Sequence, residues 1–260
     1  MAWDLVIAIV CLTALSVLAY TIGRSVQSLL PATARPFLFV VSLLLTLLFA
    51  WSWSGQLTWA AVLPFAAVIV WSNLMPILLS LTVGLAREAT GLGCWYRRAT
   101  IAALLMLGVG YTVTPVVRPI AAPVDIAAST LWRGDACLQS HSSTCAPAAA
   151  TTLLRMSGIE SDENTLVQAC LTSTVGTEPL GLFRGLAIVS AQGSCYPHLA
   201  SRDPSDWDRR GQLPNAALVH FSQWSETGTL QRFLGPRGEG HVIVICGRDA
   251  RGNWMIEDPA

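Results

Sequence analysis

The sequence predicts an α-helical transmembrane region followed by an α+β domain in which helices pack on an antiparallel sheet. Three observations predict this. Of the 260 residues, 53% are hydrophobic and only 12% are charged, whereas roughly a quarter of the residues in a soluble domain are charged. Long uncharged runs fill the first half of the chain. The second half places helix-like segments before β-branched, strand-like ones, an order that indicates an α+β domain.

Charge separates the same two parts. Residues 1–124 hold six arginines against two acids, and residues 125–260 hold ten arginines against fourteen acids. The two parts are therefore expected to occupy different environments. We divide the chain into a membrane domain at 1–120, a linker at 121–130 and a globular domain at 131–260. No basic stripe of the kind that binds nucleic acid is visible in the sequence, so no nucleic-acid partner is expected.

Four membrane-spanning helices are predicted from the uncharged runs. About 20 apolar residues cross the hydrocarbon core of a bilayer. The run between Asp4 and Arg24 has this length and lacks the basic region of a removable signal peptide. A polar break after Trp51 divides the longer run that follows, and Pro64 and Pro76 are expected to kink its second helix. The predicted helices are at residues 5–23, 36–53, 58–84 and 99–117.

The arginines predict the orientation of these helices. Arg24 and Arg35 lie in the first loop, three more arginines lie in the third, and the second loop has none. Positive loops stay in the cytoplasm, so the N-terminus and the C-terminal domain are both expected outside. Arg118, on the outer side, weakly opposes this. The span interiors hold no carboxylate, arginine or histidine, which favours a plain anchor over a transport path. Gly108 and Gly110 are expected to ease helix packing.

The C-terminal domain is expected to contain three helices and then three strands. Ser143 or Thr144 is expected to cap the first helix, and Ser161 the second. Asp249 to Gly252 is expected to form the turn of a hairpin between the last two strands. The predicted helices are at residues 145–156, 162–171 and 180–191, and the predicted strands are at 216–221, 241–246 and 254–257.

A cysteine, a histidine and an aspartate occupy positions suited to nucleophilic catalysis. Cys145 begins a helix, whose positive dipole end stabilises a thiolate. His241 begins a strand and can pair with that thiolate, and Asp258 ends the next strand, where it can accept the second ring N–H of His241. The backbone N–H of Cys145 and the side-chain amide of Gln139 are candidate donors to an oxyanion. This order of residues is similar to the papain arrangement.

Two stretches resemble the motifs of a known family, the C39 peptidases. Residues 137–159, CLQSHSSTCAPAAATTLLRMSGI, look like its first motif, in which a glutamine precedes Cys-Gly-Pro-Ala-Ala and a helix. Residues 240–260, GHVIVICGRDARGNWMIEDPA, resemble its second, in which Gly-His opens a strand and Asp-Pro closes the next. The resemblance runs from residue 130 onward, about half of the chain. It implies a papain-like fold with Cys145 as nucleophile, His241 as base, Asp258 as orienting acid and Gln139 as oxyanion donor.

The resemblance implies a membrane-anchored cysteine peptidase that hydrolyses a peptide bond in a polypeptide, with a double-glycine leader peptide as the suggested substrate class. It implies a bacterial inner or cell membrane, no cofactor or metal, and a separate secretion or transport complex as a partner besides the bilayer. The alternative is a catalytically silent, peptide-binding relative, but such domains generally lack the nucleophile. Two features depart from the family: Ala146 stands in place of a glycine, and no GxxxxGK[ST] loop of an ATPase is present.

The other cysteines and histidines have more ordinary interpretations. In an oxidising compartment Cys137, Cys170, Cys195 and Cys246 could form up to two disulfides, with three possible connectivities. No CxxC or HxxxH spacing favours a zinc site. His220 is interpreted as a structural residue of a strand. The two histidines assigned to loops are His141 and His198.

Overall fold

The computed structural model describes residues 3–89, 94–126, 129–193, 195–220 and 240–260. The chain forms two compact units, Met1–Arg118 and Pro119–Ala260. The predicted end of the membrane domain, residue 120, lies close to this division. Each unit is described by itself.

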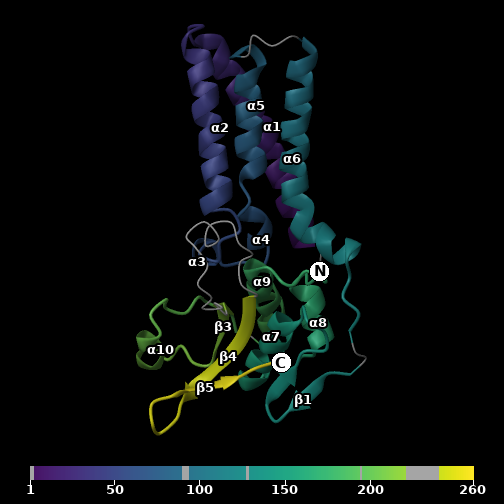
Figure 1. Cartoon of the computed structure of the whole chain (residues 1–260), viewed down its shortest axis with the longest axis vertical. Helices are drawn as coiled ribbons and strands as arrows, with labels where there is room; N and C mark the ends of the chain where they lie inside the picture. Colours follow the sequence, from purple (N-terminus) through teal and green to yellow (C-terminus); the bar gives the residue numbers. More distant parts are fainter. Residues whose placement is uncertain (1–2, 90–93, 127–128, 194, 221–239) are drawn as a thin grey trace, which may run out of the picture. The chain divides into compact units, whose positions relative to one another are not determined.

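The first unit is helical (Figure 1). Four of its segments are long and apolar enough to cross a membrane, as the sequence predicts: Trp3–Leu29, Ala34–Ser52, Val68–Ala86 and Arg98–Ala121. The helices are α1 (Trp3–Leu29), α2 (Ala34–Ser52), α3 (Trp59–Val62), α4 (Val68–Trp71), α5 (Met75–Ala89) and α6 (Cys94–Ala121).

The third span differs from the prediction of one kinked helix over 58–84, because the chain breaks twice there. Leu63 ends α3 with a non-helical backbone conformation (φ −123°, ψ 75°). Pro64 follows it, and a proline ring disfavours the helical conformation for the residue before it. Asn73 makes the second break, where its Oδ1 accepts the N–H of Met75 at 3.3 Å. Pro76 therefore lies in the first turn of α5, where its missing N–H costs nothing, and kinks no helix.

Two glycines allow α1 and α5 to cross closely. A Cβ built on Gly23 would lie 2.6 Å from the carbonyl oxygen of Leu81, and one on Gly84 would lie 2.5 Å from that of Tyr20. The expectation for Gly110 is wrong, since no described atom lies within 4 Å of a Cβ built there. Small residues at a helix crossing let the backbones approach. Gly23 and Gly84 do so between α1 and α5, and the expectation for Gly108 of α6 is met against α5, where a Cβ built on it would lie 3.1 Å from the Cδ1 of Leu79.

The second unit is an α+β domain whose helices pack on a three-stranded antiparallel sheet of order β3-β4-β5. Residues of α7, α8, α9 and β4 share its core. Its elements are β1 (Leu131–Arg133), β2 (Ala136–Leu138), α7 (Cys145–Met156), α8 (Glu163–Ala169), α9 (Pro179–Ser190), η1 (Ala191–Gly193), α10 (Ser205–Arg209), β3 (Asn215–His220), β4 (Gly240–Arg248) and β5 (Trp254–Glu257). The β1–β2 hairpin and α10 lie outside the predicted elements.

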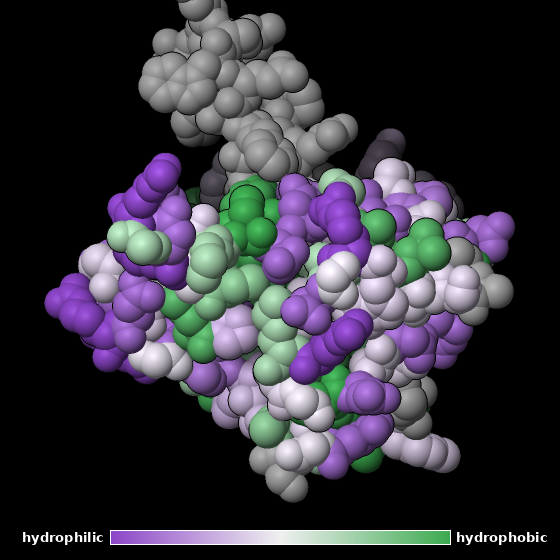
Figure 2. All heavy atoms as spheres, turned by 90° about the horizontal axis from the view of Figure 1, so that it is seen from below, coloured by the Kyte–Doolittle hydropathy of each residue, from purple (hydrophilic) through white to green (hydrophobic). Residues whose placement is uncertain are grey.

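The two units expose different surfaces. The face of the second unit shown in Figure 2 mixes many hydrophilic side chains with scattered apolar ones. The helices of the first unit instead expose large apolar side chains, such as Phe37 and Leu44 of α2 at 72% and 59%. Such a surface suits lipid rather than water.

The predicted helix caps are wrong in both cases. Asp162, and not Ser161, caps α8, with its Oδ1 accepting the N–H of Thr165 at 2.8 Å. Thr144 precedes α7 but its side chain makes no cap bond. Its hydroxyl instead donates to the carbonyl oxygen of His141 at 2.8 Å and so closes the loop that leads into α7.

Candidate functional site

The proposed base and its orienting acid are in direct contact. The Nε2 of His241 lies 2.8 Å from the Oδ1 of Asp258. His241 is the second residue of β4, and Asp258 directly follows β5. The antiparallel pairing of these strands, with Val244 opposite Glu257, brings the two residues to the same end of the hairpin. The side chain of His241 is 15% exposed and that of Asp258 is 41% exposed.

The surroundings of Asp258 keep its carboxyl group ionised. Burial alone would raise its pKa, but hydrogen bonds from the Ala260 N–H and from His241, with the positive charge of Arg133 nearby, hold the pKa below its usual value. A carboxylate only accepts hydrogen bonds, so the Nε2 of a neutral His241 carries the proton. The Nδ1 is then the nitrogen that would receive a proton from a thiol.

Cys145 is the first residue of α7 and is partly buried. It packs against a core cluster to which both α7 and β4, the strand of His241, contribute, including Ala149 and Val242. The first N–H groups of a helix have no partner within the helix, so the N–H of Cys145 is suited to bind an oxyanion. Ala146 lies inside the helix, where alanine introduces no strain.

Gln139 is held in place by contacts on both of its sides. Its backbone N–H donates to the carbonyl oxygen of Pro259 at 2.7 Å, next to Asp258. The N–H of Ser140 donates to the Oε1 of Glu163, which is 2% exposed, at 2.9 Å. The side-chain Oε1 of Gln139 is buried and has no hydrogen-bond partner among the described residues. The loop before Cys145 is therefore fastened to the segment that carries Asp258.

The structure thus brings Gln139 and the His241–Asp258 pair together through the backbone of Pro259. It places Cys145 on the core to which β4, the strand of His241, contributes. Two contributing residues are not among those predicted. From the sequence alone, Glu163 is recognisable only as an acidic residue in the first turn of a helix. Arg133 donates from its Nη2 to the backbone oxygen of Asp258 at 3.0 Å, and no sequence pattern signals a contact of this kind.

No family model matches the chain, and no match is found among curated proteins or solved structures. The resemblance to C39 peptidases therefore stays a proposal that depends on the chain's own residues.

Among the cysteines whose side chains the structure describes, no disulfide forms, so the predicted pairing of Cys137, Cys170, Cys195 and Cys246 is not seen. Burial, with the charge of Glu163, raises the pKa of Cys137 to about 12. Burial raises the pKa of Cys170 to about 12 against the opposing effect of Arg184, so neither thiol ionises near neutral pH. Within the described ranges no three His, Cys, Asp or Glu side chains gather to hold a metal ion.

The other histidines have separate surroundings. The Nδ1 of His141 lies 2.8 Å from the Oγ of Ser143. His198 lies exposed in a loop. The side chain of His220 lies outside the described residues.

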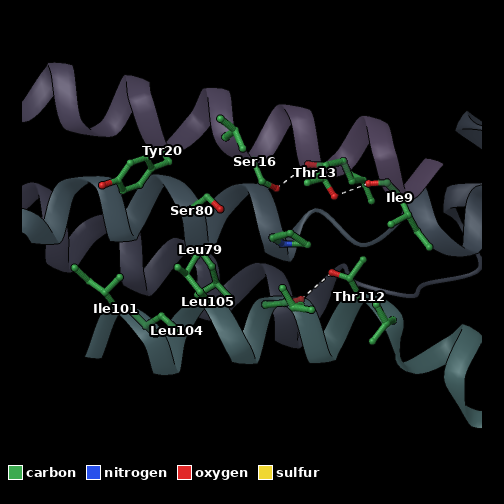
Figure 3. A pocket seen from close by; sticks show the side chains of 16 residues that line it. Ile9, Thr13, Ser16, Tyr20, Leu79, Ser80, Ile101, Leu104, Leu105 and Thr112 are labelled. Atoms are coloured by element: carbon green, nitrogen blue, oxygen red, sulfur yellow. Dashed lines mark hydrogen bonds between the residues drawn. The ribbon is translucent and has the colours of Figure 1, made fainter. Parts of the chain in front are cut away.

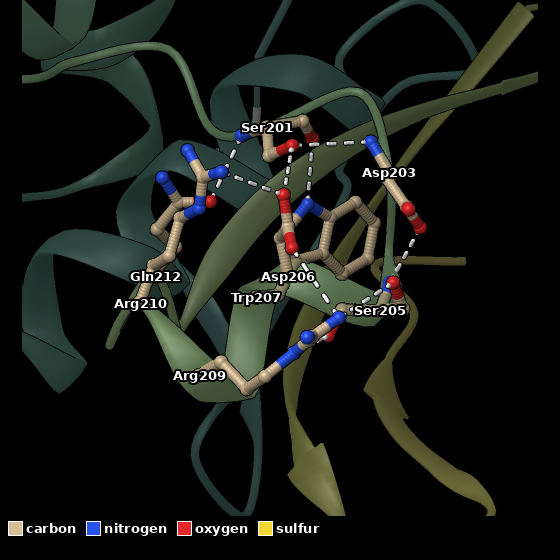
Figure 4. A network of polar contacts seen from close by, with 8 residues as sticks. All are labelled: Ser201, Asp203, Ser205, Asp206, Trp207, Arg209, Arg210 and Gln212. Atoms are coloured by element: carbon tan, nitrogen blue, oxygen red, sulfur yellow. Dashed lines mark hydrogen bonds and ion pairs between the residues drawn. The ribbon is translucent and has the colours of Figure 1, made fainter.

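A network of polar contacts joins the residues in and around α10 (Figure 4). The Nε1 of Trp207 donates to the backbone oxygen of Ser201 at 2.7 Å. The ring of Trp207 packs on that of Trp254 in β5, with centroids 5.4 Å apart. The Nε of Arg248 in β4 donates to Asp208 at 2.7 Å. These contacts tie residues 201–212 to the far end of the β4–β5 hairpin.

Proposed function

We propose that the chain is a membrane-anchored cysteine peptidase with a papain-like arrangement, similar to the C39 peptidases. The observation that carries the proposal is the 2.8 Å hydrogen bond between Asp258 and His241, whose strand β4 packs against the helix of Cys145. The residue order, the ionised Asp258 and the fastened loop of Gln139 support it further.

The chemistry follows from these positions. The Nδ1 of His241 takes the proton of the Cys145 thiol, and the thiolate attacks the substrate carbonyl carbon. The N–H of Cys145 and the amide Nε2 of Gln139 stabilise the oxyanion. The imidazolium then gives its proton to the leaving amine as the peptide C–N bond breaks and a thioester forms. Water, deprotonated by His241, hydrolyses the thioester and releases the new carboxylate and the thiol.

The four apolar helices serve as the anchor in this proposal. The arginine distribution favours a peptidase domain on the outer side of the membrane, and the resemblance suggests a bacterial cell membrane. The substrate is a polypeptide, and the resemblance suggests a double-glycine leader delivered by a separate secretion or transport complex.

Alkylation of the full chain with iodoacetamide tests the proposal. We expect Cys145 to react, with no adduct at that position in Cys145→Ala. His241→Ala should slow the reaction by about 10²-fold or more, the range of a lost general base. His198→Ala, which changes an exposed loop histidine, is the matched control and should react at the wild-type rate. Equal rates for the wild type and His241→Ala would refute an activated thiol. Rapid alkylation without cleavage of any peptide would favour the silent, peptide-binding alternative.

A further inference from the structure

A cavity of about 410 Å³ lies inside the helical unit, between α1, α5 and α6 (Figure 3). Among the sixteen described residues that line it, none is charged. Its walls include Leu12 and Val17 of α1, Leu79 of α5, and Leu105 and Val109 of α6. The volume is within the range of ligand sites, about 300–1,000 Å³.

Three hydroxyl groups of the lining, those of Thr13, Ser16 and Thr112, are bonded to their own helices. Thr13 donates to the carbonyl oxygen of Ile9 at 2.8 Å, and Ser16 to that of Leu12 at 2.7 Å. On α6, Thr112 donates to the carbonyl oxygen of its own helix four residues back, at 2.8 Å. Figure 3 shows these bonds running along the helices. Because apolar cavities stay dry, the site favours an apolar occupant over water.

The position of the cavity limits what can enter it. Its lining residues in α1 and α6 lie at 9–20 and 101–113, within the spans Trp3–Leu29 and Arg98–Ala121. Val17 and Val109 line the cavity and are 60% and 61% exposed, so it opens sideways between α1 and α6. At the depth of the hydrocarbon core, an occupant that enters from this side comes from the bilayer.

The length of the lining favours a lipid chain over a second transmembrane helix. Its residues in α1 run from Ile9 to Tyr20, which at about 1.5 Å per residue is about 17 Å, roughly half of the hydrocarbon core of about 30 Å. An acyl chain from one leaflet covers about this depth, whereas a spanning helix would run along the whole core. A slender, flexible chain fits this space. The uncharged lining would leave a carboxylate without a partner, which is costly away from water.

We propose that this cavity binds one acyl chain of a membrane phospholipid, whose headgroup stays outside the cavity. The inference depends on the membrane placement of the helices and is independent of the peptidase chemistry. A failure of Cys145 to react would leave it unchanged.

Photocrosslinking in vesicles tests the inference. The full chain is reconstituted in phosphatidylcholine vesicles that contain a phosphatidylcholine with a diazirine at mid-chain, and the adducts are mapped by mass spectrometry. We expect adducts on the lining residues of α1, α5 and α6 to exceed those on the exposed face of α2, at Phe37 and Leu44, several-fold. Equal labelling of the two surfaces would overturn the site, and the absence of adducts everywhere would overturn the membrane placement as well.

Matched substitutions separate filling of the cavity from a general disturbance. Leu105→Trp should fill the cavity and reduce its adducts several-fold, whereas Leu107→Trp, the same change at a 57% exposed position outside the lining, should not. Ser16→Phe, with Ala14→Phe as its control, repeats the test from α1 if a tryptophan in α6 prevents folding. The proposal is refuted if both substitutions of each pair reduce the adducts in the cavity, or if neither does. So would removal of the adducts by excess free fatty acid, since the ligand would then be the fatty acid.

Discussion

Replacing Asp258 by asparagine separates the shape of this side chain from its charge. The Oδ1 accepts both the Nε2–H of His241 at 2.8 Å and the backbone N–H of Ala260 at 2.9 Å. An amide nitrogen in that position would face two donors, so we expect the new side chain to place its oxygen there. His241 would then keep its tautomer, with Nδ1 still able to accept the proton of Cys145.

The structure predicts a small effect for this change. A hydrogen bond to a charged group is worth about 1.5–3 kcal/mol and one between neutral groups about 0.5–1.5, so losing the charge costs about 1 kcal/mol, or roughly five- to tenfold in rate. Asp258 is 41% exposed, and solvent screening places the effect at the lower end. Asp258→Ala removes the acceptor and frees the ring to turn, which we expect to cost about 10²-fold or more.

The assay is the second-order rate constant for alkylation of Cys145, measured for both variants at one pH with iodoacetamide. Thermal unfolding of each variant checks that the fold is retained. The reasoning is refuted if Asp258→Asn lowers the alkylation rate constant as much as Asp258→Ala does. That result would mean that the Ala260 N–H does not hold the amide oxygen of the new side chain toward His241.

Two further predictions concern stability. Against the effect of burial, the hydrogen bonds from Ala260 and His241 depress the pKa of Asp258 in the folded state. The stabilisation is therefore complete above the ordinary pKa of about 3.9 and is lost as pH falls through the lower folded value. The difference in Tm between wild type and Asp258→Asn should be present at neutral pH and shrink in acid; a difference that grows in acid contradicts this. Separately, a Cβ at Gly185 would collide with the sulfur of Cys170, which is 1% exposed. Gly185→Ala should lower the free energy of unfolding in urea by about 1–3 kcal/mol, and adding Cys170→Ala should recover part of the loss. If Gly185→Ala alone is as stable as the wild type, the prediction is wrong, because α9 can then move away from Cys170.

Elements with strong local signals begin and end where the sequence predicts. Helix α7 spans Cys145–Met156 and strand β5 spans Trp254–Glu257, both at the predicted residues. Pro147 lies in the first turn of α7, and Gly158, with φ 75°, follows its end. These signals act within a few residues, so they can be read without the rest of the fold.

Predictions failed where two local signals compete or where a partner is distant. Pro64 and Pro76 both suggest a kinked helix. The side chain of Asn73 instead accepts the N–H of Met75, the first residue of α5, so Pro76 lies in the first turn of that helix, where proline is permitted. Ser161 and Asp162 are adjacent, and both residue types are favoured at helix N-caps. The local sequence therefore does not decide at which of the two α8 begins. The close approach of Gly23 to Gly84 needs the crossing of two helices, which composition alone does not place.

The sequence by itself determined that four apolar segments can cross a membrane, that an α+β domain follows them, and that Cys145 begins a helix. These properties come from hydropathy and from interactions between residues three or four positions apart. Only the tertiary structure decided that the His241 ring meets Asp258, that Pro259 and Glu163 fasten the loop of Gln139, and that a cavity remains between α1, α5 and α6. Such contacts join segments that are far apart in the chain, so they depend on how whole elements pack and leave no periodic pattern in the sequence.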